Sequence, residues 1–470
     1  MMFKVILSLS TILFCVFFSQ AQTKEQWRAD LRFLAEEMPK VHPDLYHDMS
    51  RADFEAAVKK LYARIPSLTR EQTIIELQRI VAMVGEGHTQ IGLTRDEKVG
   101  FSRYPLILYL YSDGLFVRGA SPEYADAVGK KVIRIGKFSV DEATKIVLPI
   151  IHHDNDSNVK DILPNRLVVP EVLYALGIID SMDSAEFTLA DENGRQSKVN
   201  LKPVAQNADI KWVRANDKSP DPLPLYLKKR TENFWFEYLK DSQTMYVQFN
   251  AVQDKNDETI ADFFQKVFRF VKSNPVRKFV LDIRLNNGGD NTLIKPIIHG
   301  IIRCDKINRK GRLFTIIGRL TFSAAQNLAN ALEKDTNTIF VGEPTGNKPN
   351  HYGDAANIVL PNSKITVRVS TLYWQDMSPL DKRPWIAPQI KAELSANDFL
   401  TNDDPAMAAI LGYRQEKNES EDEIRECTCI SNQSAMLFLI PNSRHQFCGT
   451  GMKRPFQIQP SAITQVTVNP

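Results

Sequence analysis

The stretch KFVLDIRLNNGG, residues 278–289, decides the fold. It begins as an apolar run of the length of one buried strand and ends in paired glycines. Such glycines allow a tight turn whose backbone N–H groups point outward, which is the geometry that holds an oxyanion or a phosphate. Taken alone, the segment also fits a plain Gly-Gly turn. Neither the GxGxxG nor the Walker spacing of a nucleotide site is present.

Apolar strands alternate with helical stretches around this segment. We expect strands over residues 245–249, 278–283 and 338–341, and helices over residues 258–273 and 323–334. This alternation predicts a mainly parallel sheet with crossover helices. Sheets of this kind keep their chemistry in the loops at the carboxyl ends of the strands. Those loops are therefore the first places to search for a site.

Two other patterns precede this region. Residues 24–83 carry apolar side chains at helical spacing and predict three helices, and residues 94–204 change to short β-type runs with one short helix over 139–148. The predicted fold class is α/β, in a multidomain α+β chain. The predicted divisions are a signal peptide (1–21), a helical N-terminal domain (22–93), a β-rich module (94–204), an α/β core (205–413) and an irregular C-terminal tail (414–470).

Composition excludes several classes of protein. The chain has 470 residues, with 59 Lys and Arg against 56 Asp and Glu, and this balance does not indicate a nucleic-acid partner, which would require a concentrated basic stripe. The chain has five cysteines, and three of them, Cys427, Cys429 and Cys448, crowd the tail. That spacing is neither a disulfide framework nor a zinc pattern. We therefore expect no metal and no cofactor.

The amino terminus indicates export. Residues 3–18 form an apolar run, and Ser19 and Ala21 supply small residues at the −3 and −1 positions of a cleavage site. An uncleaved membrane anchor is the alternative, but the run falls short of the roughly 20 apolar residues that a span needs. We expect a periplasmic or extracellular protein with no integral membrane span after signal removal.

A second segment, RLTFSAAQ (residues 319–326), places Ser323 at a predicted strand-to-helix turn. A serine in such a turn presents its hydroxyl as in a nucleophile elbow. The alternative is an N-cap, because Gln326 three residues later fits a capping box. A third segment, GEPTGNKP (residues 342–349), is another strand exit, in which Lys348 by itself fits a solvated surface charge.

Together the three segments resemble the S41 family of serine peptidases, which includes the carboxy-terminal processing proteases, the tricorn core protease and the interphotoreceptor retinoid-binding proteins. The resemblance covers about residues 245–410 and reaches weakly upstream. GEGHT, residues 85–89, is similar to the histidine-bearing segment of the tricorn-like branch, and residues 95–204 are similar to a divergent PDZ-like module. The family implies a helical N-terminal region, a PDZ-like β-rich module and a ClpP/crotonase-like α/β catalytic core.

The resemblance also implies roles for individual residues. Ser323 would be the nucleophile, and the backbone N–H groups of Gly288 and Ala324 would form the oxyanion hole, with Gly289 as the alternative to Gly288. The processing proteases use a Ser-Lys dyad, and Lys348 lies where their lysine lies.

The tricorn-like branch uses a histidine instead, and His88 is at that motif. A histidine needs no large pKa shift to act as a base, and the run around residues 344–353 is more similar to that branch, so we rank His88 above Lys348. Asp381 is the candidate acid that orients the histidine, with Glu343 as the fallback.

The implied activity is that of an exported serine endopeptidase or C-terminal processing peptidase, a hydrolase acting on extended or unfolded protein segments that dock by strand addition. The alternative is a catalytically inactive binding protein for a peptide or a hydrophobic ligand. Departures from the family pattern at residues 286–287, Gln326 and Gln389 keep that alternative open. The run His152-His153-Asp154 is interpreted as a loop rather than a metal cluster. The sequence leaves the oligomeric state undetermined.

Overall fold

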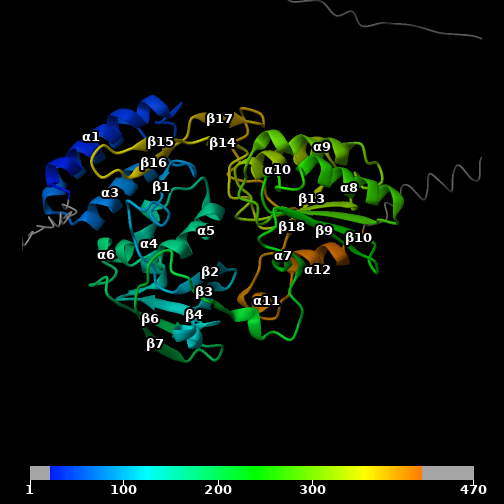
Figure 1. Ribbon diagram of the computed structural model, residues 1–470, viewed down its shortest axis with the longest axis horizontal. Coiled ribbons are helices and arrows are strands. Elements are labelled where there is room, and N and C mark those ends of the chain that lie inside the picture. The colour runs from blue at the N-terminus through cyan, green and yellow to red at the C-terminus, as the bar shows by residue number, and fades with distance from the viewer. Residues whose placement is uncertain (1–21, 415–470) are drawn as a thin grey trace, which may run out of the picture. The chain divides into compact units, whose positions relative to one another are not determined.

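The α/β core rests on a six-stranded sheet in the order β18-β13-β12-β11-β10-β9 (Figure 1). The computed structural model describes residues 22–414, so the predictions for the signal peptide and for residues 415–470 lie outside it. The strands are β9 (Phe234–Leu239), β10 (Thr244–Phe249), β11 (Lys278–Asp282), β12 (Leu313–Ile317), β13 (Ile339–Gly342) and β18 (Ile390–Lys391). All neighbours are parallel except β9, which pairs antiparallel with β10. The predicted mainly parallel sheet is confirmed.

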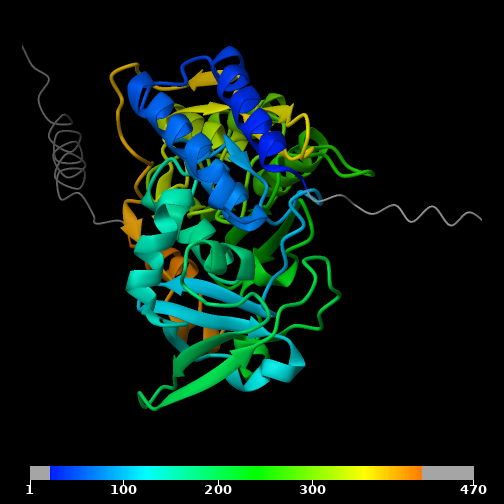
Figure 2. The same cartoon turned by 90° about the vertical axis from the view of Figure 1, so that its left-hand side faces the viewer.

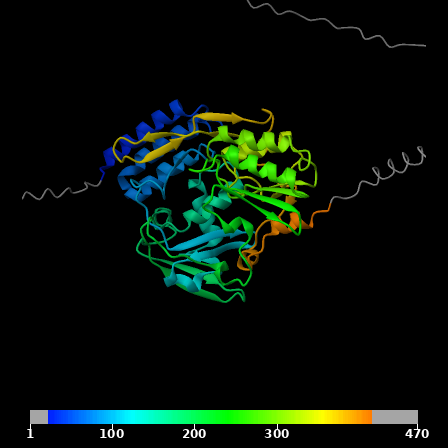
Figure 3. The same ribbon diagram turned by 45° about the vertical axis from the view of Figure 1, so that its right-hand side comes forward.

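Helices cover both faces of this sheet. The first face carries α8 (Ile260–Ser273), α9 (Lys295–Ile302) and α10 (Ala324–Asp335), and the second carries α12 (Pro405–Gly412), which Figure 3 shows against the green strands. Successive residues of a strand point to opposite faces, so Met245 and Val247 pack in the first layer and Tyr246 packs in the second. This two-sided burial explains why the strands read as continuous apolar runs.

The parallel strands β11, β12 and β13 end at the same edge of the sheet. In their register Asp282 lies beside Ile316, and Ile317 lies beside Gly342. The loops that follow these strands therefore meet in space, although they are far apart in the sequence. They are the three segments that the sequence analysis singled out.

Three helices form the N-terminal region, as predicted: α1 (Lys24–Val41), α2 (Arg51–Arg64) and α3 (Arg70–Ala82). An arm of the chain from the core crosses to them (Figure 2). Its strands are β14 (Asn350–Gly353), β15 (Ala356–Val359), β16 (Thr366–Val369) and β17 (Leu372–Gln375). Strand β16 pairs antiparallel with β1 (Gln90–Ile91), and the buried carboxylate of Asp30 on α1 accepts hydrogen bonds from Asn362 and Ser363 at the β15–β16 turn.

The β-rich region is an antiparallel sheet in the order β2-β3-β4-β6-β7. The strands are β2 (Leu106–Tyr111), β3 (Gly114–Ala120), β4 (Lys131–Ile135), β6 (Ala185–Ala190) and β7 (Gln196–Leu201), with β5 (Phe138–Ser139) beside β4 and β8 (Val213–Arg214) beside β3. The predicted short helix is α4 (Val140–Val147). The sequence analysis did not identify α5 (Asp156–Arg166) or α6 (Pro170–Ala175). The remaining short helices are α7 (Leu225–Lys228) and α11 (Ala396–Leu400).

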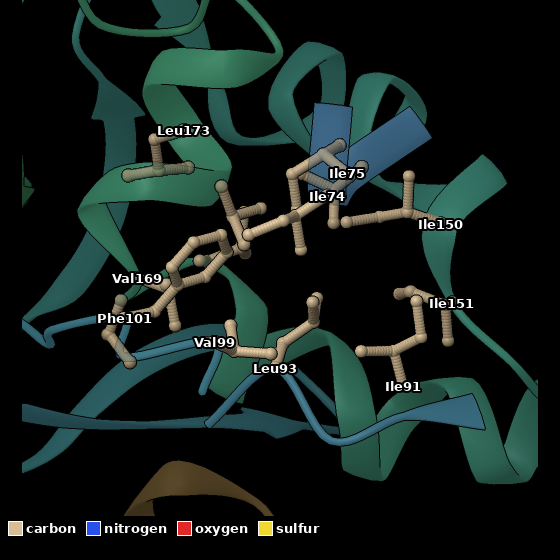
Figure 4. Packing of buried hydrophobic residues seen from close by; sticks show 14 of the residues in the cluster. Ile74, Ile75, Ile91, Leu93, Val99, Phe101, Ile150, Ile151, Val169 and Leu173 are labelled. Atoms are coloured by element: carbon tan, nitrogen blue, oxygen red, sulfur yellow. The ribbon is translucent and has the colours of Figure 1, made fainter. Parts of the chain in front are cut away.

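One buried apolar cluster joins the N-terminal helices, the β-rich sheet and the β15–β16 arm. Figure 4 shows Ile75 of α3 near Ile150 and Ile151, with Ile91 and Leu93 in the same cluster. The chain between α3 and β2 contributes buried side chains to this cluster on either side of the loop of residues 85–89, among them Val84 and Ile91. Within residues 22–414, no helix has the length and apolarity needed to cross a membrane.

Candidate active site

Ser323 lies in a strained turn between β12 and α10. Its φ of 54° and ψ of −128° fall in a region that residues with a side chain rarely adopt. Ser323 occupies the N-cap position of α10, but its side chain makes no capping hydrogen bond, so the capping box with Gln326 does not form. A serine held in this way at the start of a helix resembles a nucleophile elbow in its geometry.

Gly288 packs directly against that turn. A Cβ atom added to Gly288 would lie 2.6 Å from Ser323 Cβ and 3.0 Å from Ala324 N. Its φ of 100° also excludes most other residues. The fold thus brings together Ser323, Gly288 and Ala324, as the three-segment pattern predicts.

The backbone N–H groups around Ser323 are not equally available. Gly288 N donates to Asn286 Oδ1 at 2.9 Å, and Asn286 Nδ2 donates in turn to the Phe249 carbonyl oxygen at 2.9 Å. Within residues 22–414, the N–H groups of Ala324 and Gly289 have no acceptor. The Gly289 N–H is therefore free to donate, whereas the Gly288 N–H is already engaged.

His88 lies in the loop between α3 and β1. Its ring stacks on Phe322, with 4.5 Å between ring centroids and 29° between the planes. Among the described residues neither ring nitrogen has a hydrogen-bond partner, so neither an acidic side chain nor Ser323 is hydrogen-bonded to the ring. Burial, with the nearby His351 and Arg368, lowers the pKa of His88 to about 3. The imidazole is neutral at pH 7.

Glu86 is hydrogen-bonded to the loop that carries His88. Its carboxylate accepts hydrogen bonds from the His88 backbone N–H and from Ser370 Oγ, the latter at 2.8 Å. Burial raises the pKa of Glu86, while hydrogen bonds from Thr89 and Ser370 oppose that rise. The sequence analysis quoted this residue within GEGHT but gave it no role.

A hydrogen-bonded path links the histidine loop to the serine turn. Asp154 Oδ2 accepts from Gly87 N at 3.0 Å and from Asn347 Nδ2 at 2.6 Å, and Asn347 Oδ1 accepts from the Ser323 N–H. Burial raises the pKa of Asp154 to about 7, with a contribution from Glu86. Asp154 and Asn347 were not predicted as site residues, although both lie in segments of the sequence that carry candidate groups.

Asp154 lies in the loop before α5, as predicted for the run His152-His153-Asp154. Within residues 22–414, no group of acidic, histidine or cysteine side chains is arranged to hold a metal ion. The paired histidines suggested a metal site in this run. Of its three members only Asp154 is linked to the serine turn, through Asn347. The residue of this run that belongs to the candidate site is therefore the acid, not the paired histidines.

Lys348 lies beside this path. Its side chain is half-buried, and its charge lowers the pKa of Asp154 against the effect of burial. Among the described residues no ion pair is formed by Lys348. The structure thus places Lys348 near the serine turn without joining it to the nucleophile.

The two candidate orienting acids have other partners. Glu343 forms a buried ion pair with Arg319, through N···O distances of 2.8 and 2.9 Å. Asp381 binds Arg383 at 2.8–3.1 Å, which lowers its pKa. Neither acid is hydrogen-bonded to His88.

A third acid, Asp376, was not considered in the sequence analysis. It accepts hydrogen bonds from Asn327 and Asn330 of α10, at 2.6 and 3.1 Å. Its charge also raises the pKa of His351, which burial lowers to about 4. His351 in turn stacks near His88, with 6.0 Å between the ring centroids. Asp376 thus lies between the asparagines of α10, which it binds, and His351, which stacks near His88.

Comparison with known proteins identifies the fold. No protein-family profile matches the sequence, and no curated protein is significantly similar to it. Among solved structures, mature CPAF complexed with lactacystin matches with a TM-score of 0.59 and 11% identity over 87% of this chain and 99% of that chain. Mature CPAF alone matches with a TM-score of 0.57 and 12% identity over 88% and 99%.

The photosystem II D1 C-terminal processing protease matches with a TM-score of 0.40 and 15% identity over 83% of this chain and 97% of that chain, a score too low to support an argument. The CPAF matches cover 87% and 88% of this chain and share its fold, whereas their low identity shows nothing about activity. The fold class that the three motifs implied is confirmed.

Proposed function

Because the chain has an S41-type peptidase fold, we propose that it is a serine-type peptidase that hydrolyses peptide bonds through an acyl-enzyme at Ser323. One observation carries this proposal: the strained backbone of Ser323 packs directly against Gly288. A strained backbone of this kind persists only where the surrounding structure enforces it, and such residues cluster at active sites.

The proposed reaction starts with attack of Ser323 Oγ on a peptide carbonyl carbon. The oxyanion that forms would be bound by the N–H of Ala324 and by that of Gly288 or Gly289. Gly288 N must leave Asn286 Oδ1 before it can take part, whereas Gly289 N needs no such change. The serine proton passes to a base and then to the leaving amine, and water hydrolyses the acyl-enzyme.

We propose His88 as the base, with Lys348 as the alternative. The neutral ring of His88 can accept a proton, and the path through Asp154 and Asn347 ties its loop to the serine turn. A base works best when its pKa is near the working pH, so a substrate or a shifted carboxylate has to raise the pKa of His88 during the reaction. Asp381, Glu343 and Asp376 are the candidate acids for this role, and each would have to leave its present partner to reach His88.

A fluorophosphonate probe tests the nucleophile. The wild-type chain should be labelled, and Ser323→Ala should be neither labelled nor able to cleave an unstructured protein, a loss of roughly 10³-fold or more. Ser363→Ala, in the distant β15–β16 turn, is the matched control and should be labelled normally. Lack of labelling in a folded wild-type chain would support the inactive binding protein instead.

The base is tested by a second pair of variants. His88→Ala should lose roughly 10²- to 10⁴-fold in kcat, the range of general-base catalysis, while Lys348→Ala should lose much less. Full activity of His88→Ala together with an inactive Lys348→Ala would assign the base to Lys348. Circular dichroism of both variants separates loss of the base from loss of the fold.

We propose, further, that the protein is exported after cleavage following Ala21, and that residues 94–204 serve as a PDZ-like docking module for the substrate chain. The exposed edge strand β7 supports this, because edge strands accept an added strand. Amino-terminal sequencing of the protein recovered from the periplasm or the medium tests export. A product that still begins at Met1 would contradict it.

A further inference from the structure

A cavity of about 90 Å³ lies between the β-rich sheet and the second face of the core sheet. From the β-rich sheet, Tyr109 of β2 and Arg118 of β3 line it. From the core, Ile316 of β12 and Tyr226 of α7 line it. Neither Ser323 nor a proposed base belongs to its wall. The cavity is therefore separate from the site of the proposed reaction.

Four arginines line this cavity, and only two of them are neutralised inside the fold. Arg284 and Arg319 each bind a carboxylate, at 2.9 and 2.8 Å. The partner of Arg319 is Glu343, the acid that lines the cavity. Over the described part of the chain, Arg118 and Arg230 form no ion pair. The cavity wall thus carries two positive charges that lack a counter-charge.

The two unpaired arginines belong to one positive cluster. A second cavity, of about 80 Å³, shares Arg118 and Arg230 with the first and is also lined by Arg214. Partial burial, and then the charges of Arg118 and Arg214, lower the pKa of Arg230. Like charges that are held together repel one another. An anion placed between Arg118 and Arg230 would therefore be attracted by both.

Aromatic rings hold the guanidinium of Arg118 in place. Its central carbon lies 4.1 Å from the centroid of the Phe399 ring and 4.8 Å from that of the Tyr109 ring. Such cation–π contacts position a guanidinium without supplying a counter-charge. A guanidinium also offers a planar fork of N–H donors that matches a carboxylate. Arg118 is thus positioned in advance for an anionic ligand.

Tyr226 adds a buried hydroxyl group to the same wall. The residue is 4% exposed, and among the described residues its Oη has no hydrogen-bond partner. Burial raises the pKa of Tyr226 to about 12, against the opposing effect of Arg118 and Arg284. The hydroxyl group therefore keeps its proton at neutral pH. A buried donor without an acceptor is costly, so an acceptor supplied by a ligand would stabilise it.

Much of the remaining wall is apolar and limits the size of the ligand. Leu285, Ile316, Leu394 and Ala406 contribute to it. A dry cavity of roughly 150 Å³ holds benzene, so the smaller cavity here suits a chain of about four carbon atoms. An inorganic ion would leave this apolar surface uncovered.

We propose that the cavity binds a small organic anion, a carboxylate of about four carbon atoms. The charged head would lie between Arg118 and Arg230 with Tyr226 as a further donor, and the apolar part would pack against the end of β12. The ligand would bridge β3 of the β-rich sheet and α7 of the core, and would thereby stabilise their contact. This inference does not depend on the proposed peptidase activity.

Isothermal titration calorimetry of the full chain with butyrate tests the site. Butyrate should bind with a Kd of about 1 mM or below, and uncharged butyramide should bind at least tenfold more weakly. From acetate to butyrate the affinity should rise by about fourfold for each CH₂ group, and hexanoate should add little because the cavity is then full. Inorganic phosphate, which has no apolar part, should bind more weakly than butyrate.

Variants of the wall locate the ligand. Arg118→Met and Arg230→Met should each weaken butyrate binding by about tenfold, and Tyr226→Phe by about threefold to tenfold. Arg118→Lys should keep part of the affinity, because a lysine retains the charge but not the planar fork. Arg166→Met, which changes a buried arginine that lines a different cavity, is the matched control and should keep the full affinity. Butyrate should also raise the Tm of the wild-type chain more than that of Arg118→Met, and the same melting curves show whether each variant folds.

Several results would overturn the inference. They are no binding of butyrate, equal binding of butyrate and phosphate, or a loss of affinity in Arg166→Met but not in the folded variants of the wall. Ser323→Ala should bind butyrate as the wild-type chain does, because Ser323 does not line the cavity. Loss of binding in that variant would place the ligand at the serine turn instead. Fluorophosphonate labelling tests the proposed function separately, so the failure of one proposal leaves the other standing.

Discussion

Two buried arginines of this protein have opposite surroundings. Arg284, at the end of β11, binds Asp404 through two contacts of 2.9 Å and also binds Asp282, which accepts from Tyr246 Oη at 2.7 Å. Arg166, at the end of α5, has no hydrogen-bonded partner among the described residues. Arg166 is 6% exposed and the Arg284 side chain is 14% exposed, so the main difference lies in what neutralises them.

This difference separates a structural charge from a charge available to a ligand. The carboxylates around Arg284 hold the loop after β11 against the start of α12. An arginine that is already paired with carboxylates gains little by binding an anionic ligand. An unpaired arginine gains a counter-charge from any anion that reaches it. The comparison predicts stability changes of opposite sign when each arginine is removed.

The largest effect is expected for Arg284→Met. Removal of the guanidinium leaves Asp282, which is fully buried, without its counter-charge, and breaking a buried pair in this way costs about 3–5 kcal/mol. Urea denaturation should show this loss. Adding Asp282→Asn should recover part of it, because the unpaired charge is then gone. A decrease in the free energy of unfolding of less than about 1 kcal/mol would show that the Arg284 ion pairs contribute no more than surface ion pairs do.

Asp154 should make the free energy of unfolding depend on pH. Its pKa is about 7 in the folded chain, above the ordinary 3.8, so between these values the folded state binds more protons and stability falls as the pH rises from about 4 to 7. The full shift corresponds to at most roughly 4 kcal/mol. Denaturation of Asp154→Asn across this range should show a flatter profile. An unchanged slope would show that Asp154 is charged throughout the range.

The smallest effect, and the one of opposite sign, is expected for Arg166→Met. Replacing an unpaired buried guanidinium by an apolar side chain of similar length should raise the free energy of unfolding by about 1–2 kcal/mol. The same urea denaturation measures it beside Arg284→Met. A loss of more than about 2 kcal/mol would show that Arg166 is structural and would erase the contrast between the two arginines.

The sequence predicted most of the elements but not all. The three N-terminal helices and the strands around residues 245–249 and 278–283 were recognised because their periodicity is long or their burial two-sided. Strand β12 was missed, since a five-residue apolar run cannot be told from part of a buried helix by pattern alone. The four-residue strands of the arm β14–β17 were also missed, and one of them, β16, pairs with the distant strand β1.

The site was predicted only in part. Ser323, Gly288 and Ala324 were identified from three motifs, and the fold brings them together. Asp154 and Asn347 were not identified, because their importance depends on contacts across 193 sequence positions.

By itself, the sequence determined the alternation of strands and helices, the turn glycines and the residues that the three strand-end loops carry. These properties follow from local patterns of polarity and backbone freedom. Only the tertiary structure decided that Gly288 N is already engaged, that His88 lacks an orienting acid and that Arg166 lacks a partner. Hydrogen bonding and desolvation depend on which distant groups share a buried space, and no local pattern in the sequence encodes that.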